Sequence, residues 1–198
     1  MLKTLLLLVV IVSLSWAADY ELLLEDPDIF APCTEPPPGS IDFLEAFNID
    51  NLVLDQDADI IHVSENITTN WDVEPNDRIS ARFALMHFNR GNWEPTLFTL
   101  VSQDFCAALF DEGQSWFKQW TKHISNRDEV QKKCLKTRGT VWMHNPFDLQ
   151  LRLYDIRGAN LQGRYKAVVT FEAFDERDVP RKNSICFEIR GEAEKIKK

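Results

Sequence analysis

Residues 78–100, RISARFALMHFNRGNWEPTLFTL, decide the fold class. This stretch holds two apolar-rich runs, residues 78–88 and 93–100, on either side of Asn89-Arg90-Gly91-Asn92. Tight hairpin turns favour asparagine and glycine, because both adopt left-handed backbone angles at little cost. The stretch therefore predicts two antiparallel strands joined by a turn.

A further strand is predicted upstream, over residues 61–73. Its odd positions are largely apolar, as at Ile61 and Ile67, and its even positions are polar, as at His62 and Asn66. Such alternation is typical of a sheet with one buried face and one face in water. Asn66 begins the sequon Asn66-Ile67-Thr68, so the pattern places a glycosylation acceptor on the wet face.

The C-terminal part of the chain continues the β pattern. Leu149, Leu151 and Leu153 alternate with polar residues, and residues 165–174 and 185–190 form a last pair of strands. Two sheets packed face to face would accommodate all of these strands. The predicted fold is therefore mainly β, a two-sheet β-sandwich.

One or two short helices are expected to interrupt the strands after the hairpin. Ser102 can cap the first helix, and Trp116, Phe117 and Trp120 recur at helical spacing. A helix that lies on a sheet buries such an aromatic stripe in the core, but the same stripe can border a ligand site. Both interpretations remain open.

The chain begins with the features of a secretory signal peptide. Lys3 precedes an apolar run, and Ser15-Trp16-Ala17 has the small-residue pattern that signal peptidase recognises. The run is too short for a membrane-spanning helix, which needs about 20 apolar residues. We expect residues 1–18 to be removed and the protein to be secreted, extracellular and soluble.

Residues 19–40 are expected to form an acidic, proline-rich extended arm, and residues 41–198 a single domain. Pro36-Pro37-Pro38 cannot continue a helix or a central strand. Cys33 lies in the arm, which favours a segment anchored by a disulfide bond over a disordered tail.

The four cysteines are Cys33, Cys106, Cys134 and Cys186, an even number that suits an oxidising compartment. Their wide spacings lack the Cys-x-x-Cys pairs of a zinc site, so two disulfide bonds and no metal are expected. Four cysteines allow three pairings, and the spacing does not choose among them.

Charge and motifs argue against several functional classes. The formal net charge is −9, whereas a nucleic-acid-binding protein needs a basic surface. With only seven glycines, the chain has no Gly-x-Ser-x-Gly elbow, no His-Glu-x-x-His motif and no glycine-rich phosphate loop. The acidic run over residues 55–59 lacks the spacing of a calcium-binding loop. We therefore expect a protein that is not an enzyme and that has no cofactor and no nucleic-acid partner.

Five features follow one another in a characteristic order along the chain. They are Asp104-Phe105-Cys106-Ala107-Ala108-Leu109-Phe110-Asp111, Cys134, Asn145-Pro146-Phe147-Asp148, Leu161-Gln162-Gly163-Arg164-Tyr165-Lys166 and Ser184-Ile185-Cys186-Phe187-Glu188-Ile189. Their order and spacing resemble the ganglioside-activator branch of lipid-recognition proteins, and most closely its insect chemosensory B members. The resemblance covers roughly Cys33 to Ile196, and its most specific part is the Gly163-x-Tyr165 strand followed by the terminal cysteine strand.

The resemblance implies a β-cup, in which the two sheets splay apart at one side and leave an apolar cavity for lipid chains. It also implies disulfide bonds between Cys33 and Cys186 and between Cys106 and Cys134. Alternation supports the first pair, because Cys186 lies on the face opposite to Ile185, where an outer arm can reach it. The further cysteines of the ganglioside activators have no counterpart here, so neither the loops at the cavity mouth nor the ligand carries over.

Such a cavity binds without catalysis, because each CH₂ group that leaves water contributes about 0.8 kcal/mol. The candidate wall residues are Phe83, Leu85, Leu97, Val169 and Phe171. The candidates for a mobile lip are Trp116, Phe117 and Trp120. Each of these residues can equally be ordinary core packing, because protein interiors are normally filled to crystal-like density.

The sequence thus predicts a secreted glycoprotein that carries or presents an apolar small molecule, either a lipid or a long-chain hydrocarbon. The resemblance adds a role in chemosensation or pheromone response, with a membrane surface or a receptor as a further partner. The first alternative is a secreted protein-interaction β-sandwich with a filled core, acting as a receptor ligand or modulator. The second is a secreted enzyme of unfamiliar type, which would need convergent polar groups in its pocket.

Overall fold

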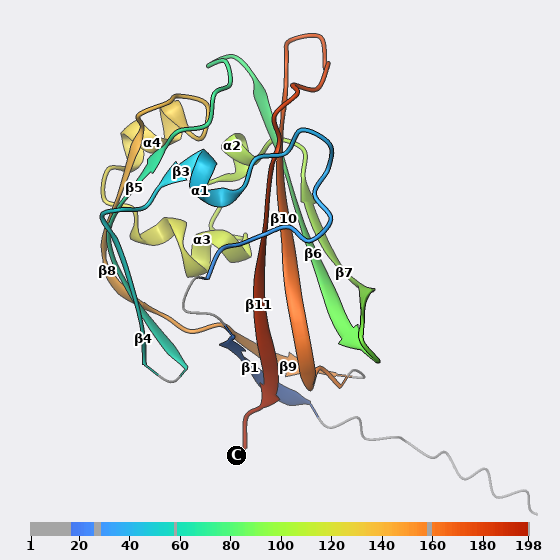
Figure 1. The fold of residues 1–198 in the computed structure, drawn as a ribbon. Coiled ribbons are helices and arrows are strands. Elements are labelled where there is room, and N and C mark those ends of the chain that lie inside the picture. Colours follow the sequence, from blue (N-terminus) through green and yellow to red (C-terminus); the bar gives the residue numbers. More distant parts are fainter. Residues whose placement is uncertain (1–16, 26–28, 58, 158–159, 198) are drawn as a thin grey trace, which may run out of the picture.

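Two antiparallel sheets face one another in the computed structural model (Figure 1). The structure describes residues 17–25, 29–57, 59–157 and 160–197. Nearly all of the expected signal peptide, residues 1–18, lies outside these ranges. The fold is a mainly β sandwich that curls into a cup, as the sequence predicted.

The larger sheet contains seven strands in the order β7-β6-β10-β11-β1-β9, with β2 paired to β11. These strands are β1 (Ala18–Leu24), β2 (Ala31–Pro32), β6 (Arg78–Asn89), β7 (Asn92–Ser102), β9 (Arg152–Ile156), β10 (Gly163–Phe174) and β11 (Ile185–Lys195). β1 and β9 lie across the lower end of the molecule in Figure 1, so this sheet curls toward the other sheet.

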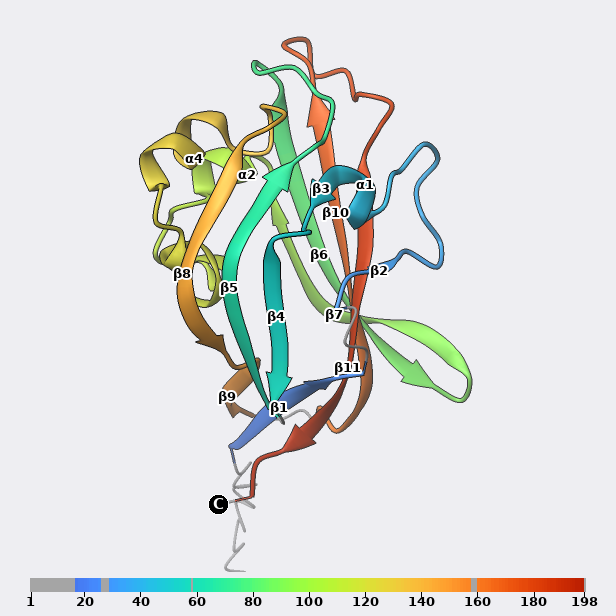
Figure 2. The ribbon, with the colours of Figure 1, turned by 60° about the vertical axis from the view of Figure 1, so that its left-hand side comes forward.

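The smaller sheet contains four strands arranged around β5. They are β3 (Phe47–Asn48), β4 (Leu52–Asp57), β5 (Ile60–Thr69) and β8 (Val141–Leu149). β8, β5 and β4 run side by side in Figure 2. The inward residues Ile61, Val63 and Ile67 of β5 are buried, in agreement with the predicted alternation.

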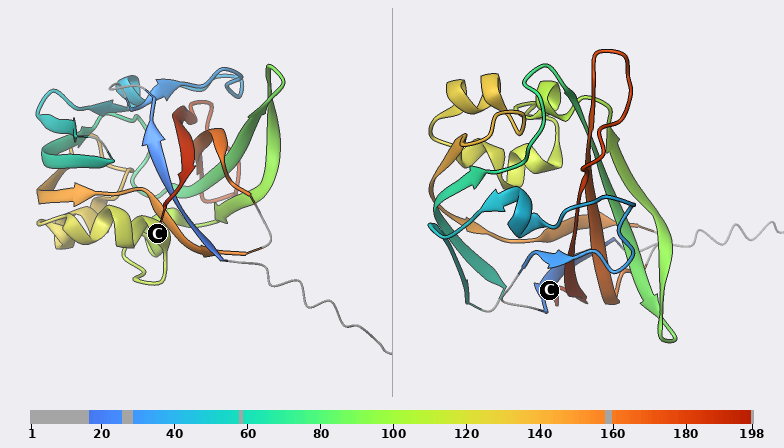
Figure 3. Two further views of the ribbon diagram at one scale, coloured as in Figure 1. Left: turned by 90° about the horizontal axis from the view of Figure 1, so that it is seen from below. Right: turned by 45° about the horizontal axis from the view of Figure 1, so that its top comes forward.

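Short helices are more numerous than the one or two that the sequence predicted. The described residues contain α1 (Phe43–Ala46), α2 (Phe105–Ala108), α3 (Ser115–Gln119), α4 (Arg127–Lys133) and a 3₁₀ turn, η1 (Thr121–His123). Seen from below, the sheets form two opposite walls, the helices that follow β7 close a third side, and α1 with the N-terminal segment closes the fourth (Figure 3).

The first of the predicted helices begins later than expected. Ser102 is the last residue of β7 and does not cap the helix. Asp104 is the N-cap of α2, and its side chain accepts a hydrogen bond from the backbone N–H of Ala107 at 3.0 Å. The strand outcompetes the cap at Ser102 because its backbone pairs with Ala81 of β6.

The predicted hairpin is confirmed, with a left-handed turn at its tip. Arg90 and Gly91 have φ angles of 49° and 89°, as the tight hairpin turn requires. A register shift between Ala84 and Met86 leaves extra residues in β7 near Pro95. Bulges of this kind are common in edge strands, where proline costs no ladder hydrogen bond.

Residues 145–148, which contain Pro146, form no turn despite the proline. These residues continue β8, and Asn145-Pro146 is accommodated by a register shift opposite Val63 and Glu65 of β5. Proline is compatible with a sheet at such a bulge, because no ladder hydrogen bond is required of it there.

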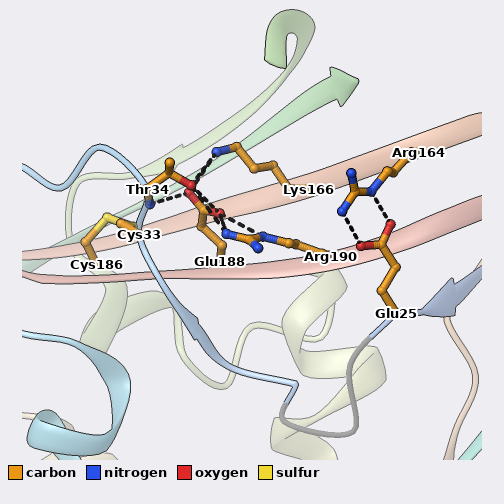
Figure 4. A network of polar contacts seen from close by, with 8 residues as sticks. All are labelled: Glu25, Cys33, Thr34, Arg164, Lys166, Cys186, Glu188 and Arg190. Atoms are coloured by element: carbon orange, nitrogen blue, oxygen red, sulfur yellow. Dashed lines mark hydrogen bonds and ion pairs between the residues drawn. A yellow bond between two sulfur atoms is a disulfide. The ribbon is translucent and has the colours of Figure 1, made fainter. Parts of the chain in front are cut away.

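Residues 19–40, the expected arm, contribute β1 and β2 to the larger sheet before the proline-rich part begins. The chain then crosses to the outer face of β11, where Cys33 forms a disulfide bond with Cys186 (Figure 4). The second disulfide bond joins Cys106 to Cys134, beside α2 and α4. Both pairs are those that the family resemblance implies.

A buried charged cluster fastens the arm beside the first disulfide bond. The carboxylate of Glu188 accepts hydrogen bonds from Lys166 Nζ, from the Thr34 backbone N–H and from Arg190 Nη2, each at 2.8 Å (Figure 4). We call these four residues the arm clasp. Lys166 and Glu188 are both buried, so the arm covers polar groups on the outer face of the sheet.

Candidate functional site

An apolar cavity of about 460 Å³ lies between the two sheets. Its wall is built from both sheets, from the helices and from the N-terminal segment. The residues that line it include Leu24, Phe30, Phe43, Phe47, Ile61, Ile67, Phe83, Phe105, Leu109, Trp116, Trp120, Trp142, Leu149, Ala167, Val169, Phe171, Phe187 and Ile189. Two polar residues, Gln119 and Thr121, also line it. We call this space the apolar cavity.

Strand alternation places these side chains. In β10, Ala167, Val169 and Phe171 line the apolar cavity, while Lys166, the residue before Ala167, belongs to the arm clasp on the opposite face. The same period of two directs Phe187 and Ile189 of β11 inward. The inner face of the larger sheet is therefore an uninterrupted apolar surface.

Three of the polar groups at this wall are already hydrogen-bonded within the protein. The Thr121 hydroxyl donates to the Leu109 carbonyl at 3.0 Å, and Trp116 Nε1 donates to the Ala108 carbonyl at 3.1 Å. Trp142 Nε1 donates to the Thr69 hydroxyl at 3.2 Å. The cavity can therefore offer a ligand apolar contact and aromatic faces rather than hydrogen bonds from these groups.

A second cavity of about 420 Å³ adjoins the first and is more polar. Its wall includes Tyr20, Glu21, Leu22, Leu85, Phe98, Arg152, Leu153, Ile156, Leu161, Tyr165 and Ala193. Gln119 and Leu151 line both cavities. We call this second space the tyrosine cavity; it lies where β1 and β9 curl across the end of the larger sheet.

The structure brings most of the predicted site residues together. Phe83, Val169 and Phe171 line the apolar cavity with the lip candidates Trp116 and Trp120. Leu85 lines the tyrosine cavity instead.

Two predicted site residues lie elsewhere. Leu97 is fully exposed, and Phe117 lines neither cavity but lies 6.0 Å from the guanidinium carbon of Arg127. The hairpin register explains Leu97. Because Phe88 pairs with Trp93, odd residues of β6 stand opposite even residues of β7, and the two-residue shift near Pro95 preserves that parity. Leu97 therefore points away from the face that carries Phe83 and Leu85.

Several lining residues were missed by sequence reasoning. Tyr20 and Leu22 belong to β1, in a segment expected to be an arm. Phe43 begins the unpredicted helix α1, and Phe47 follows it. The alternation of Trp142 with Met143 and His144 was a usable signal for β8, but the proline that follows obscured it.

His144 is a buried histidine in contact with Trp120 of the cavity wall. It is buried against Trp120, with ring centroids 5.0 Å apart, and its Nδ1 lies 3.3 Å from the Glu65 carbonyl oxygen. Burial lowers the pKa of His144, the hydrogen bond to Glu65 opposes that shift, and the nearby His123 adds to it. Its Nε2 has no hydrogen-bond partner in the described part of the chain.

Metal-binding groups do not converge near either cavity. Within the described ranges, no three His, Cys, Asp or Glu residues are placed to hold a metal ion.

Asn66 of the sequon is partly exposed on β5. Among the described residues, no helix has the length and apolar character needed to cross a membrane.

Comparison with known proteins assigns no family. No family model matches the chain, and no curated protein matches it.

Proposed function

We propose that this protein binds an apolar small molecule, a lipid or a long-chain hydrocarbon, and carries or presents it outside the cytosol. One observation carries the proposal: a cavity of about 460 Å³ whose wall is apolar except for Gln119 and Thr121. Small-molecule sites typically have volumes of about 300–1,000 Å³ and mostly apolar walls.

The physical reason is the cost of leaving such a space empty. Protein interiors are normally close-packed, and a void deprives its lining of dispersion contacts. Water is poorly stabilised in such a space, because an ordered water molecule needs two to four polar hydrogen-bond partners. An alkyl chain restores the contacts and itself leaves water, at about 0.8 kcal/mol for each CH₂ group.

The setting of this function is proposed from the sequence. The signal-peptide pattern, the sequon at Asn66 and two disulfide bonds suit a secreted glycoprotein. The resemblance to insect chemosensory B proteins suggests chemosensation or pheromone response, with delivery to a receptor or a membrane surface. Binding and release of a ligand require no catalytic group.

The alternative, a secreted protein-interaction sandwich that modulates a receptor, has one observation in its favour. β7 is an edge strand that exposes Leu97 and Val101 on the face away from the cavities. Exposed apolar side chains in a row are typical of docking surfaces. The apolar cavity favours the carrier, because an interaction module has no need of a hollow interior.

The test is native mass spectrometry of the secreted, disulfide-intact protein, followed by organic extraction and by displacement of a fluorescent fatty-chain probe. We expect a co-purifying apolar molecule at a stoichiometry of about one. Protein that is empty and fails to bind any apolar probe would contradict the proposal and favour the interaction module.

A pair of matched variants locates the site. Ala167→Trp places an indole in the apolar cavity from β10, and Ala84→Trp places one on the opposite face of the same sheet. We expect the first variant to lose probe binding by about tenfold or more and the second to bind like the unmodified protein. Equal loss, or loss only in Ala84→Trp, would contradict binding between the sheets.

A further inference from the structure

We infer that the ligand is a long-chain molecule with a neutral, oxygen-bearing head such as an alcohol or an ester. Its chain fills the apolar cavity, and its head lies in the tyrosine cavity beside Tyr165 and Gln119. This inference rests on the proposed function and specifies the chemical class of the ligand.

The two cavities lie end to end along the same strands. In β10, Phe171, Val169 and Ala167 line the apolar cavity, and Tyr165, the next inward residue, lines the tyrosine cavity. At 3.3 Å per residue, the row from Phe171 to Tyr165 spans about 20 Å.

Two other strands show the same order. In β1, Leu24 lines the apolar cavity and Leu22 the tyrosine cavity. In β11, Ile189 lines the first and Ala193 the second. Since Gln119 and Leu151 line both, an extended molecule along the strands meets apolar walls first and polar groups at its end.

Tyr165 is the main polar group at that end. It is 6% exposed, and in the described part of the chain its hydroxyl has no hydrogen-bond partner. Burial, with a smaller contribution from Tyr20, raises the pKa of Tyr165, so the phenol stays neutral and can donate or accept. Because Tyr165 lines the cavity and its hydroxyl is not sealed in the core, that hydroxyl can hydrogen-bond a ligand oxygen there.

Gln119 supplies a second polar group at the junction. It follows Lys118 at the end of α3 and lines both cavities, and its amide has no hydrogen-bond partner among the described residues. An amide offers both donors and an acceptor, so it suits a hydroxyl or a carbonyl oxygen equally.

The charges around the tyrosine cavity argue against an ionised head. The guanidinium of Arg152 already donates to the Asp59 carboxylate and lies 3.8 Å from that of Glu21. Two carboxylates thus face one guanidinium, so the three groups together carry a net negative charge and repel a fatty-acid carboxylate. The buried Nε of Arg152, which has no hydrogen-bond partner in the described part of the chain, can donate to a neutral ligand oxygen. The buried apolar residues Leu161 and Ala193 in the same wall raise the cost of placing a charge beside them, whether carboxylate or ammonium.

The test compares probes that differ only at the head: hexadecane, hexadecan-1-ol, methyl palmitate, palmitic acid and hexadecylamine, each displacing the same fluorescent probe. We expect the alcohol and the ester to bind about five to ten times more tightly than hexadecane, the effect of one net hydrogen bond. The acid and the amine should bind more weakly than the alcohol.

Tyr165→Phe removes the hydroxyl with little change in shape. We expect it to reduce the preference for the alcohol over hexadecane to about twofold, with hexadecane affinity unchanged. Gln119→Leu should reduce the same preference without affecting folding, because Gln119 is largely exposed. Gln162→Leu, at an exposed glutamine outside both cavities, is the matched control for Gln119→Leu and should change nothing.

The outcomes separate the two levels of proposal. If hexadecane binds as tightly as the alcohol and Tyr165→Phe changes nothing, the head-group inference is wrong and the proposed function stands. If palmitic acid or hexadecylamine binds most tightly, the neutral head is wrong. If no probe binds, the proposed function itself fails.

Discussion

Gly191 of β11 lies where the larger sheet leaves no room for a side chain. A Cβ atom at this position would lie 2.6 Å from the Leu23 carbonyl oxygen and 2.9 Å from Leu22 Cδ1, both in β1. Its partner across the other edge of β11 is Tyr165. The absence of a side chain therefore lets β1 approach close enough to close the tyrosine cavity.

We expect Gly191→Ala to lower the free energy of unfolding by about 1–3 kcal/mol, because backbone atoms of β1 must move to relieve the clash. Urea unfolding measures the change. Gly113→Ala is the control: its Cβ would meet only the flexible side chain of Asp111 at 3.2 Å, so a change under about 0.5 kcal/mol is expected. Equal effects of the two substitutions would refute the role of β1 packing.

His144 gives the stability of the protein a pH dependence of definite sign. Because burial lowers its pKa below the ordinary value of 6.5, the unfolded chain takes up a proton at a pH where the folded protein does not. The contribution of neutral His144 is therefore fully present above about pH 6.5 and is lost as the pH falls toward the lowered pKa.

We expect the free energy of unfolding to decrease between about pH 6.5 and 5, by no more than about 1.4 kcal/mol per pH unit for one group. His144→Phe should make this slope shallower, with the remainder due to His123, whose pKa burial also lowers. The comparison variant is His62→Gln, because the hydrogen bond that His62 donates to Asp148 raises the pKa of His62, so the acid-side loss should persist in this variant. An unchanged slope in His144→Phe would exclude the assignment.

At the scale of elements, the arm clasp holds the N-terminal segment onto β10 and β11. Burial alone would raise the pKa of Glu188, but hydrogen bonds from Lys166, Thr34 and Arg190 outweigh it and hold the pKa below its ordinary value of 4.5. The ionised carboxylate thus stabilises the fold above about pH 4.5, and that contribution is lost as the pH falls through the lowered pKa.

We expect Glu188→Gln to lower the free energy of unfolding at pH 7 by roughly 3–5 kcal/mol, because it leaves the buried Lys166 uncompensated. Adding Lys166→Met should restore part of the loss. Glu192→Gln, at an exposed position two pairs along the same face of β11, serves as the control and should be nearly neutral. Chemical denaturation of the unmodified protein and the three variants measures these free energies of unfolding. If Glu188→Gln leaves the free energy of unfolding nearly unchanged, the arm clasp does not stabilise the fold.

The elements that could be predicted are those whose pattern is local. The turn over residues 89–92 predicts a hairpin, and therefore β6 and β7. Regular alternation of apolar and polar residues predicts β10 and β11. β1 was missed because its apolar residues Leu22, Leu23 and Leu24 do not alternate; their burial is set by contact with β11 and with both cavities. α4 was missed because only Val130 of that helix is buried, which leaves no apolar stripe.

At the scale of the whole molecule, the cavities could be expected but not located. Alternation correctly assigned Phe83, Val169 and Phe171 to the inner face of a sheet, because neighbouring residues in the strand determine the face to which each side chain points. Whether an inner face is filled or hollow depends on how far apart the sheets stand, and that distance is set by α1, α3 and the N-terminal segment together. The division into an apolar and a more polar cavity arises only where β1 and β9 curl across the larger sheet.

A ligand that bridges the sheets should stabilise the whole fold. At a free concentration one hundred times its dissociation constant, hexadecan-1-ol is expected to raise the free energy of unfolding by about 2.7 kcal/mol, because it binds the folded state alone. Urea unfolding with and without the alcohol measures this increase. Ala167→Trp should abolish most of it, and an equal increase in that variant would mean that the alcohol binds outside the apolar cavity.

The pairing of β1 with β11 and the disulfide bond between Cys33 and Cys186 also set the order of events during biosynthesis. The two cysteines are 153 positions apart, whereas Cys106 and Cys134 are 28 apart. At ordinary translation rates Cys33 waits on the order of ten seconds for its partner to emerge, while the shorter bond can already form. The seven-stranded sheet therefore closes only after the ribosome has released residue 186 and those that follow. Until then, a nascent chain with one free thiol and an uncovered apolar face depends on the chaperones and disulfide isomerases of its compartment.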